Sequence, residues 1–344
     1  MMSLVYRQLM QSMTYPTGSY SGKTIIITGS NTGLGKEAAR HYARLGAGRL
    51  ILAVRSLDKG AAAKADIEAG VANAAIEVWH LDMASYASVR RFAARVESEL
   101  ERLDIFLANA GLARTRLVMA EGNEEMVTVN FISTFLLAAL VMPKLKETAG
   151  CFGTRPTLTI VASATHGHTQ LPQKSAAEAQ LLETINQGPS STSSWAEHYA
   201  VSKLLQVMGV RALAERHPSS AVTVNCVNPG LCHSELARDV QGWRFHLFKM
   251  AFARSTEAGS RTLVHAAAQG PESHGRYLSE CALVEPSAFV RSLEGKRTQD
   301  RVWDELVDRL EAIQPGVLPI NEKVPARYQN GIRRDGQVQF LVAL

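Results

Sequence analysis

The sequence predicts an α/β fold, a single doubly wound parallel sheet with helices on both faces and a C-terminal helical extension. Three observations predict it. Short apolar runs alternate with helical stretches along most of the chain, which is typical of a parallel sheet covered on both faces. The first run ends in a glycine-rich turn that leads into a helical pattern. Neither an internal repeat nor a low-complexity segment interrupts this alternation.

The expected elements follow in order from the N-terminus. Strands are expected at residues 24–27, 50–54, 76–81, 104–108, 157–161 and 222–227, with a further candidate at 275–278. The clearest helical patterns are at 36–45, 88–100, 124–145 and 200–216. The polar stretch 167–194 lies outside the alternation and contains a short helical patch at 176–185. A late helix is expected at 291–313, because four apolar side chains share one helical face: Val302, Leu306, Leu310 and Ile313.

These elements fit one folding unit, because 344 residues suffice for one large α/β domain. We expect an N-terminal extension at 1–21, the main domain at 22–290, and a C-terminal helix and tail at 291–344 that pack on the same domain. The last six residues, 339–344, are apolar, and we expect them to dock on the body of the protein rather than to form a loose end.

The composition is that of a globular protein with a sizeable core, 46% hydrophobic and 20% charged. The formal charge is +5, and the Lys and Arg residues are scattered, so no nucleic-acid surface is expected. A mildly basic balance suits a phosphate-bearing ligand, although ordinary surface solvation explains it equally well.

Cysteine usage and apolar patterning bear on the compartment. The four cysteines form no CxxC pair, which argues against a metal site or a disulfide framework and favours a reducing compartment. Residues 1–16 contain no unbroken apolar run, so no signal peptide is expected. The most apolar window, 131–142, is shorter than the ~20 residues of a membrane helix. We therefore expect a buried core helix, no membrane span and a cytoplasmic protein.

The first chemical signal is the glycine-rich turn at residues 28–35, between the first strand and its helix. Glycines allow a tight turn and let the backbone approach a pyrophosphate at the helix N-terminus. A turn of this kind is weak evidence alone, but its place between strand and helix favours a nucleotide site. The residues expected to contact the cofactor here are Gly29, Asn31, Thr32, Gly33, Leu34 and Gly35.

The end of the second strand indicates which dinucleotide binds. An acid about 20 positions beyond the glycines suits the ribose of NAD, whereas an arginine there accepts the 2′-phosphate of NADP. Arg55, followed by Ser56, occupies this place, and a guanidinium suits phosphate; a solvated arginine is the alternative. Asp82, followed by Met83, comes after the third strand and is placed to bond the adenine amino group.

The catalytic signal is the pair Tyr199 and Lys203. Being four residues apart, they share one face of a helix. A phenol with a pKa near ~10 is a poor acid–base group at neutral pH, but a neighbouring ammonium and the nicotinamide charge lower that pKa. Among the eight tyrosines, Tyr199 alone has a lysine at the fourth position onward, and we expect it to begin a helix after the fifth strand.

Together these segments resemble the short-chain dehydrogenase/reductase family, whose domain is a Rossmann-type fold. Residues 28–35 match its TGxxxGxG turn. Its catalytic tetrad is matched by Asn130, Ser163, Tyr199 and Lys203. Two further elements of the family are matched by Asn109-Ala110-Gly111 after the fourth strand, and by Asn228-Pro229-Gly230 with Ser234. The matches occur in order and cover roughly residues 22–235.

Several segments look like the retinol-dehydrogenase-like branch of that family, namely 28–33, 53–55, 162–166 and 229–236. The extended C-terminal part is similar to fungal members of that branch, which often serve secondary metabolism. The branch commonly has two serines where this chain has Ala162-Ser163, so the catalytic serine is retained. The loop between Ser163 and Tyr199 is long, 36 positions, which leaves the substrate open rather than the chemistry.

The resemblance implies an NADP(H)-dependent oxidoreductase, in first place a reductase of a ketone or aldehyde on a lipophilic small molecule. It implies that Ser163 holds the carbonyl oxygen and Tyr199 protonates it. Lys203 is expected to bind the nicotinamide ribose and to lower the pKa of Tyr199, and Asn130 to hold a water that connects Lys203 with solvent. Besides the residues already given, cofactor contacts are expected from Asn109, Ala110, Gly111, Pro229, Gly230 and Ser234.

Substrate contacts are expected from His166 and from the segment 236–254, which contains Trp243 and Phe248. The family places its substrate lid there, although these aromatic residues also fit an ordinary core helix. His166 and His168 form an HxH pair, but without a third ligand in sight a metal site is disfavoured.

Three alternatives remain open. The chain fits an NADP-dependent dehydrogenase of a retinol- or steroid-like alcohol, although Arg55 favours reduction because cellular NADP pools are usually reduced. An inactive cofactor-binding regulatory protein should lack part of the tetrad, and all four residues are present. A homodimer is also open, because related proteins dimerise through the helices at 124–145 and 200–216.

Overall fold

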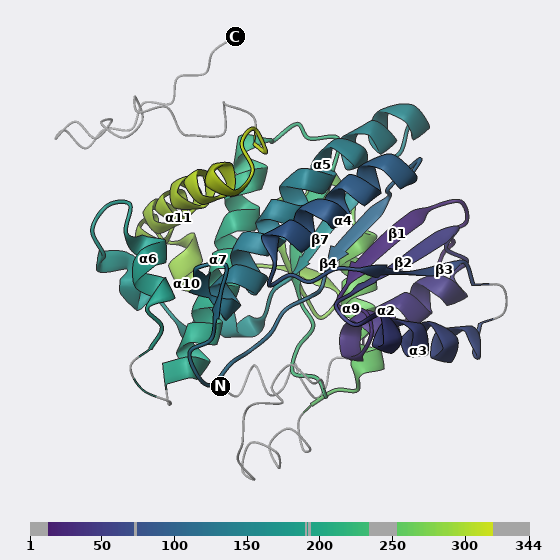
Figure 1. The fold of residues 1–344 in the computed structure, drawn as a ribbon, viewed down its shortest axis with the longest axis horizontal. Coiled ribbons are helices and arrows are strands. Elements are labelled where there is room, and N and C mark those ends of the chain that lie inside the picture. Colours follow the sequence, from purple (N-terminus) through teal and green to yellow (C-terminus); the bar gives the residue numbers. More distant parts are fainter. Residues whose placement is uncertain (1–12, 72–73, 190, 192–193, 234–252, 319–344) are drawn as a thin grey trace.

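The computed structural model describes residues 13–71, 74–189, 191, 194–233 and 253–318 (Figure 1). Within them lies an eight-stranded sheet with the order β3-β2-β1-β4-β7-β8-β9-β10, in which all neighbours are parallel except β9 and β10. The order of strands reverses between β1 and β4. This switch point is where ligands bind in doubly wound folds, at the carboxyl ends of the strands.

The strands expected from the sequence are confirmed within two residues at either end. They are β1 (Thr24–Thr28), β2 (Arg49–Val54), β3 (Ile76–His80), β4 (Ile105–Ala108), β7 (Thr157–Val161), β8 (Thr223–Asn228) and β9 (Tyr277–Ser279). The edge strand β10 (Ala282–Val284) and a small hairpin of β5 (Met119–Ala120) and β6 (Asn123–Glu124) were not predicted. These strands have two or three residues each, too few to show a period.

Helices cover both faces of the sheet (Figure 1). One face carries α2 (Gly33–Arg44), α3 (Leu57–Glu68) and α9 (Thr256–Ala267), and the other carries α4 (Tyr86–Glu99), α5 (Ser133–Phe152) and α7 (Trp195–Arg216). The late helix is confirmed as α11 (Leu293–Ile313), which packs on α7 and on α6 (Leu181–Asn186). The remaining short turns are η2 (Ala164–His168), η3 (Pro172–Ser175), η6 (Pro271–Ser273) and α10 (Ala288–Arg291).

Two helices begin elsewhere than the sequence predicts. The expected helix 124–145 starts as the π-helical turn η1 (Val127–Ile132), which contains Asn130, and continues as α5. π-helical turns are frequent at functional sites. The helix of the catalytic pair starts at Trp195, so Tyr199 lies one turn inside α7 rather than at its beginning. The reason is local: Trp195 is buried and anchors an additional first turn.

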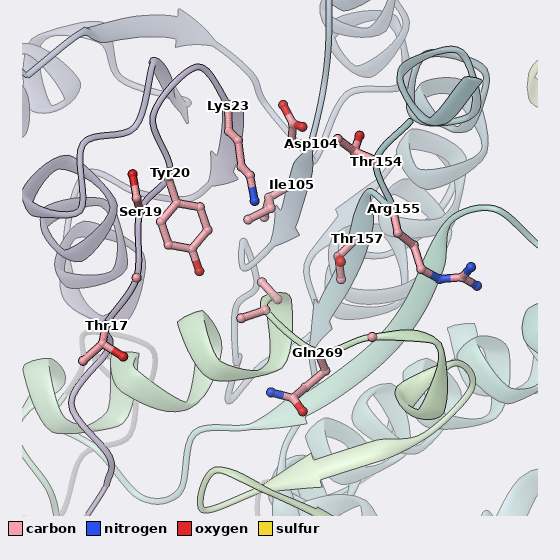
Figure 2. A pocket seen from close by; sticks show the side chains of 14 residues that line it. Thr17, Ser19, Tyr20, Lys23, Asp104, Ile105, Thr154, Arg155, Thr157 and Gln269 are labelled. Carbon is pink, nitrogen blue, oxygen red and sulfur yellow. The ribbon is translucent and has the colours of Figure 1, made fainter. Parts of the chain in front are cut away.

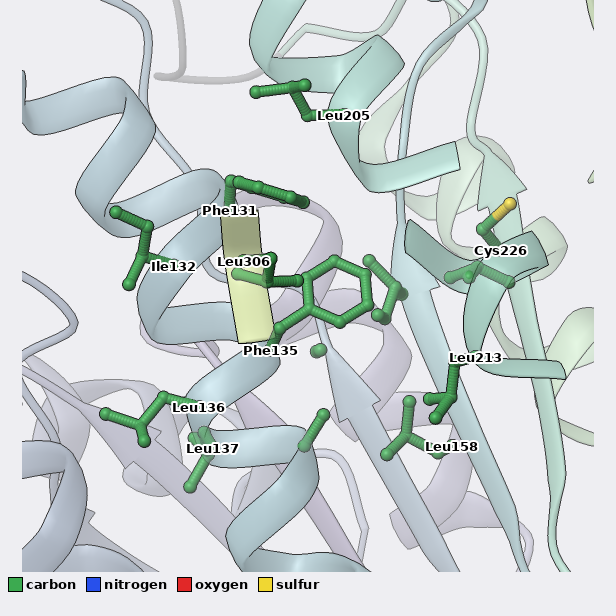
Figure 3. Packing of buried hydrophobic residues seen from close by; sticks show 14 of the residues in the cluster. Phe131, Ile132, Phe135, Leu136, Leu137, Leu158, Leu205, Leu213, Cys226 and Leu306 are labelled. Carbon is green, nitrogen blue, oxygen red and sulfur yellow. The ribbon is translucent and has the colours of Figure 1, made fainter. Parts of the chain in front are cut away.

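The core lies on both sides of the sheet as two clusters of apolar side chains. The cluster on the α4, α5 and α7 side is shown in Figure 3, and it includes Leu306 of α11 together with Phe131 and Phe135. These two rings meet edge to face with centroids 5.3 Å apart. Helix α11 therefore completes this side of the core.

The segment Val127–Phe152, η1 and α5 together, is the one described helix that is long and apolar enough to cross a membrane. In the structure 78% of its most apolar window is buried inside the protein. As the sequence predicts for 131–142, it is a core helix.

The described part of the N-terminal extension lies against α2 and α9. The Arg261 guanidinium donates to the carbonyl of Met13 at 2.9 Å, and that of Arg44 to the carbonyl of Pro16 at 2.7 Å. The ring of Tyr15 contacts both guanidinium groups. A cavity of about 340 Å³ lies nearby at the amino ends of the strands, lined among others by Tyr20, Lys23 and Thr157 (Figure 2). It is at the opposite edge of the sheet from the switch-point crevice.

Candidate active site

The glycine-rich turn after β1 needs glycine at two of its positions because the chain from β4 passes so close. Gly29 has φ of +65°, and a Cβ there would lie 2.9 Å from the Cα of Ala110. A Cβ on Gly35 would lie 2.5 Å from Nδ2 of Asn109. Real Cβ atoms do not approach other atoms this closely, so both positions exclude larger residues. The turn is thereby pressed against the switch point.

Asn109 and Ala110 fasten this turn across the β1–β4 junction. The Asn109 amide donates to the carbonyls of Thr28 at 2.9 Å and Gly29 at 3.2 Å. The backbone N–H of Ala110 donates to the hydroxyl of Thr28 at 2.9 Å. The Asn109 amide group, expected among the cofactor contacts, therefore holds the turn in shape.

The N-terminus of α2 suits an anion. Its N-cap residue Thr32 makes no side-chain capping bond, and its first turn contains no acid. The first backbone N–H groups of a helix lack intrahelical partners and carry the positive end of the helix dipole. A pyrophosphate is the group that such a glycine-lined helix start binds.

The residues after β2 and β3 lie at the same edge of the sheet. Arg55 is exposed, and no ion pair is recorded for it among the described residues. Ser56 accepts a bond from the N–H of Lys59 and so caps α3. Asp82 is half-buried, and its carboxylate accepts one bond from the N–H of Ala84 at 3.0 Å. Within the described part of the chain, the Arg55 guanidinium is therefore exposed and outside any recorded ion pair.

Asn228, at the end of β8, joins the loops around the catalytic serine. Its side-chain oxygen accepts from the N–H groups of Ala164 at 2.9 Å and Gly230 at 3.1 Å. Its amide donates to the hydroxyl of Ser279 at 3.0 Å. The Pro229-Gly230 turn is thus held beside the loop that carries Ser163. Ser234, expected to extend this segment, lies outside the described residues.

Ser163 and Tyr199 meet at the carboxyl end of β7. Ser163 follows that strand and accepts a bond from the N–H of Thr165 at 3.2 Å. Tyr199 is partly buried on α7, and its phenol shares a hydrogen bond with the Ser163 hydroxyl. Loss of hydration raises the pKa of Tyr199 above its usual value, and the bond with Ser163 opposes that rise. In the protein alone Tyr199 is a neutral phenol, able to donate a proton.

Lys203 lies one turn beyond Tyr199 on the same face of α7. Its Nζ is 5.8 Å from the centre of the Tyr199 ring. The side chain is buried, and loss of hydration lowers the pKa of Lys203 to about 7. Nζ donates to the carbonyl of Val161 and to Oε1 of Gln206, each at 2.9 Å.

Asn130 is fully engaged by protein groups. Its side chain pairs with both backbone groups of Leu112 at 2.9 Å and donates to the Ser202 hydroxyl at 3.0 Å. Its main-chain carbonyl accepts from Nε2 of Gln206 at 2.6 Å. The Gln206 side chain therefore connects Asn130 with Lys203, and a water held by Asn130 next to Lys203 stays a prediction.

His166 does not have the substrate-facing place expected for it. It is buried, Nδ1 lies 2.7 Å from the carbonyl of Ser163, and Nε2 accepts from the N–H of Ser287 at 3.0 Å. Because the carbonyl only accepts and the amide only donates, the ring is neutral with its proton on Nδ1. Both nitrogens are used, so His166 links the Ser163 loop to α10. The expected lid residues Trp243 and Phe248 lie outside the described residues.

Comparison with known proteins decides the family. Residues 23–176 match the short chain dehydrogenase family. The chain is 61% identical over 320 residues to the short chain dehydrogenase/reductase dmxR8 of Cryptosporiopsis sp., a match that covers 92% of this chain and 99% of that protein. The chain belongs to the short-chain dehydrogenase/reductase family.

Other relatives and solved structures agree. The short-chain dehydrogenase anuD of Penicillium roqueforti is 40% identical to this short-chain dehydrogenase/reductase, over 94% of this chain and 87% of that protein. A 3-ketoacyl-(acyl-carrier-protein) reductase of Brucella melitensis complexed with NADH superposes with a TM-score of 0.59 at 21% identity, over 76% of this chain and 97% of that chain. An alcohol dehydrogenase of Thermococcus sibiricus complexed with 5-hydroxy-NADP superposes with a TM-score of 0.55 at 20% identity, over 75% of this chain and 95% of that chain. Such structural likeness shows the fold.

The structure adds residues to this short-chain dehydrogenase/reductase site that sequence patterns missed. The sequence could have pointed to Gln206 only through its position one turn after Lys203 on the same helix. Glu124 and His198 form a buried pair, with carboxylate oxygen and ring nitrogen 3.1 Å apart, directly before Tyr199. They are separated by 74 positions, so no local pattern predicts the contact.

Proposed function

We propose that this short-chain dehydrogenase/reductase is an NADPH-dependent, cytoplasmic reductase that converts a ketone or aldehyde of a lipophilic small molecule, such as a secondary metabolite, into an alcohol. One observation carries the proposal: on α7 the Tyr199 phenol lies next to Ser163 and one turn from Lys203, whose Nζ is 5.8 Å from the centre of its ring. A protonated acid at this place suits a reaction that ends with protonation of an oxygen.

The residues around the turn fit a dinucleotide phosphate. Gly29 and Gly35 let the turn pack closely against Ala110 and Asn109, and the start of α2 offers N–H groups without intrahelical partners. Arg55 is the group proposed to take the 2′-phosphate, because it is exposed at the end of β2 without a recorded ion pair among the described residues. When bound, NADPH supplies the hydride.

The side chains of the site then have distinct tasks. Ser163 donates a hydrogen bond to the carbonyl oxygen and so favours the negative charge that develops there. Tyr199 gives that oxygen its proton. Lys203, when charged, stabilises the phenolate that Tyr199 becomes, and it is proposed to hold the nicotinamide ribose.

A lipophilic substrate is supported by the apolar surface next to this site. Leu117 and Met119 are 51% and 53% exposed, in and just before the β5–β6 hairpin. Leu117 and the Trp195 ring both border Gly188, and Trp195 is one turn before Tyr199 on α7. Apolar side chains exposed beside polar catalytic groups are typical of a cleft for an apolar molecule.

Oxidation of an alcohol is the second candidate, because the same groups can act in reverse. It needs Tyr199 as a phenolate base, and the raised pKa of Tyr199 opposes that form near neutral pH. In the protein without cofactor, this shift favours the protonated form of Tyr199 that reduction needs.

Tyr199→Phe tests the proposal. The change removes the proton and keeps the ring, so NADPH binding should survive while single-turnover reduction of a lipophilic ketone falls by ~10²-fold or more. Tyr42→Phe is the matched control, because the Tyr42 hydroxyl is buried in α2 without a hydrogen-bond partner among the described residues. Wild-type turnover by a folded, NADPH-saturated Tyr199→Phe protein would refute the proposed acid.

A further inference from the structure

Gln206 joins two parts of the site that lie far apart in sequence. It is on α7, three residues after Lys203, and its side chain is fully buried. Its Oε1 accepts from Nζ of Lys203 at 2.9 Å, and its Nε2 donates to the main-chain carbonyl of Asn130 at 2.6 Å. One amide thus spans from the lysine to the π-helical turn.

The chemistry of its partners fixes the orientation of this amide. An ammonium group only donates hydrogen bonds, so the oxygen of Gln206 must face Lys203. A carbonyl only accepts, so the NH₂ group must face Asn130. The reversed amide would lose both bonds.

The π-helical turn provides the acceptor. Within η1 the carbonyls of Val129 and Asn130 both accept side-chain bonds, the first from the Thr134 hydroxyl at 2.9 Å. Such carbonyls are normally occupied by the next turn of an α-helix. The irregular turn therefore presents a backbone oxygen towards α7.

The Gln206 carbonyl is important for Lys203 because few polar groups face this buried ammonium. The titratable group facing the ammonium is the Tyr199 phenol, on α7 itself. The other packed elements present uncharged groups: Asn130 from η1, the Val161 carbonyl from β7, and Gly111 after β4. No carboxylate is recorded against Lys203 within the described residues, and loss of hydration lowers its pKa to about 7. The Gln206 oxygen offsets part of that loss.

We propose that Gln206 is a positioning residue for proton transfer, which keeps the Lys203 ammonium charged and aimed by tying it to the Asn130 carbonyl. An ammonium has three donors. Val161 and Gln206 accept two of these hydrogen bonds. The third N–H of Lys203 is therefore left to point towards Tyr199 and the cofactor ribose. This inference rests on the proposed function of the same site.

Gln206→Met tests it, because methionine keeps the length of the side chain and forms neither bond. Lys203 should then lose its proton more readily, and the Tyr199 phenolate should lose stabilisation. We expect the pKa of Tyr199 in the NADP⁺-saturated protein to rise by about one pH unit. The measurement is the phenolate absorbance during a pH titration, as a difference from the same protein with Tyr199→Phe. NADPH affinity, measured by fluorescence, should weaken several-fold.

Gln299→Met is the matched control. Gln299 is equally buried and bonded, to Arg211 at 3.1 Å and Glu215 at 3.0 Å, but it lies on α11 away from Lys203. It should leave the Tyr199 titration unchanged, even if stability falls. If Gln206→Met does not fold, Gln206→Asn replaces it, since the shorter amide cannot span both partners and should shift the titration in the same direction.

An unchanged Tyr199 titration in a folded Gln206 variant overturns the inference. Failure of the proposed function has a different signature, namely wild-type turnover by the Tyr199→Phe protein. The two results are therefore distinguishable.

Discussion

Tyr199 and Lys203 respond in opposite directions to one cause. Burial disfavours charge, so it raises the pKa of the phenol and lowers that of the ammonium to about 7. The protein alone thus holds a neutral acid next to a lysine whose positive charge is opposed by burial. A modest change in the surroundings of Lys203 is enough to alter its charge, which makes its neighbours on α7 and η1 important for turnover.

Arg55 is the residue on which cofactor preference is proposed to depend. Replacing Arg55 with Asp removes the proposed phosphate partner and adds a repulsive charge. NADPH binding should weaken by more than tenfold, at least ~1.4 kcal/mol, while NADH binding changes little. Fluorescence titration with both cofactors measures this. Arg91→Asp, the same change at an exposed position on α4, is the control, and equal affinities of the unmodified protein for NADH and NADPH would count against the assignment.

For single residues, spacing in the sequence predicted the correct neighbours only where the partner is near in the chain. Tyr199 and Lys203 are four apart on one helix, so their shared face follows from helical geometry. His166 was expected at the substrate because it lies near Ser163 in the sequence, and its partner Ser287, 121 positions away, gave no local signal. The bond between Gln206 and Asn130 spans 76 positions. Contacts of this kind depend on how elements pack, which a local pattern does not contain.

At the scale of elements, the glycine-rich turn and the chain after β4 form one unit. The bonds from Asn109 and Ala110 to Thr28 and Gly29 close the turn over the switch point. The start of α2 can therefore lie this close to Asn109 only because residue 35 is glycine and has no Cβ.

Gly35→Ala should displace Asn109 and open this unit. We expect NADPH affinity to fall by at least tenfold, together with a lower thermal midpoint, because a Cβ would lie 2.5 Å from Nδ2 of Asn109. Gly150→Ala, at an open position near the end of α5, should instead stabilise by roughly 0.5–1 kcal/mol through helix propensity. Calorimetry and NADPH titration of both variants measure the contrast; similar behaviour of the two would contradict the close-packed turn.

Element prediction succeeded where burial produces an uninterrupted apolar run, as in β1 and β7. It missed α3, whose sequence LDKGAAAKADIE offers small side chains instead of an apolar stripe. It missed α9 for a related reason, since Gly259, Ser260 and Thr262 are buried there among few large apolar residues. Small residues that fit close to a neighbouring helix carry little periodic signal.

At the scale of the whole molecule, α11 covers the side of the core formed by α5 and α7, the helices at which the sequence leaves dimer contacts open. Helix α7 has 16 of its 22 residues buried within the single chain, and Trp303 and Leu306 of α11 are buried in the same cluster. Within this chain α11 therefore covers part of α7, and a homodimer stays a prediction.

Stability should depend on pH through histidines that burial keeps neutral. The pKa values of His41, His166, His265 and His274 are all lowered from 6.5, with loss of hydration as the largest cause. The unfolded chain gains protons at these sites near pH 6.5 while the folded chain does not, so stability is fully present above that pH and is lost below it. The urea midpoint should therefore fall between about pH 7.5 and 5.5.

Two variants separate this effect from others. His166→Phe should reduce the slope of stability against pH in that range, whereas His80→Gln, at an exposed position, should leave the slope unchanged. Glu77 and Glu257, whose pKa values are lowered from 4.5 by Arg49 and Arg261 respectively, act only in more acidic solution. A flat profile of the wild-type protein would contradict the neutral, buried histidines.

The two apolar clusters on opposite faces of the sheet have a consequence for how such an enzyme changes over generations. The glycine-rich turn and Arg55 belong to the layer of α2 and α3, whereas Asn130, Tyr199 and Lys203 belong to the layer of α5 and α7. If cofactor preference depends on Arg55 as proposed, substitutions that change it are expected in the first layer, and substitutions that reshape the reacting cleft are expected in the second. In directed evolution, the residues of each layer can therefore be mutated in a separate library, and the best variants from the two libraries can then be combined in one chain.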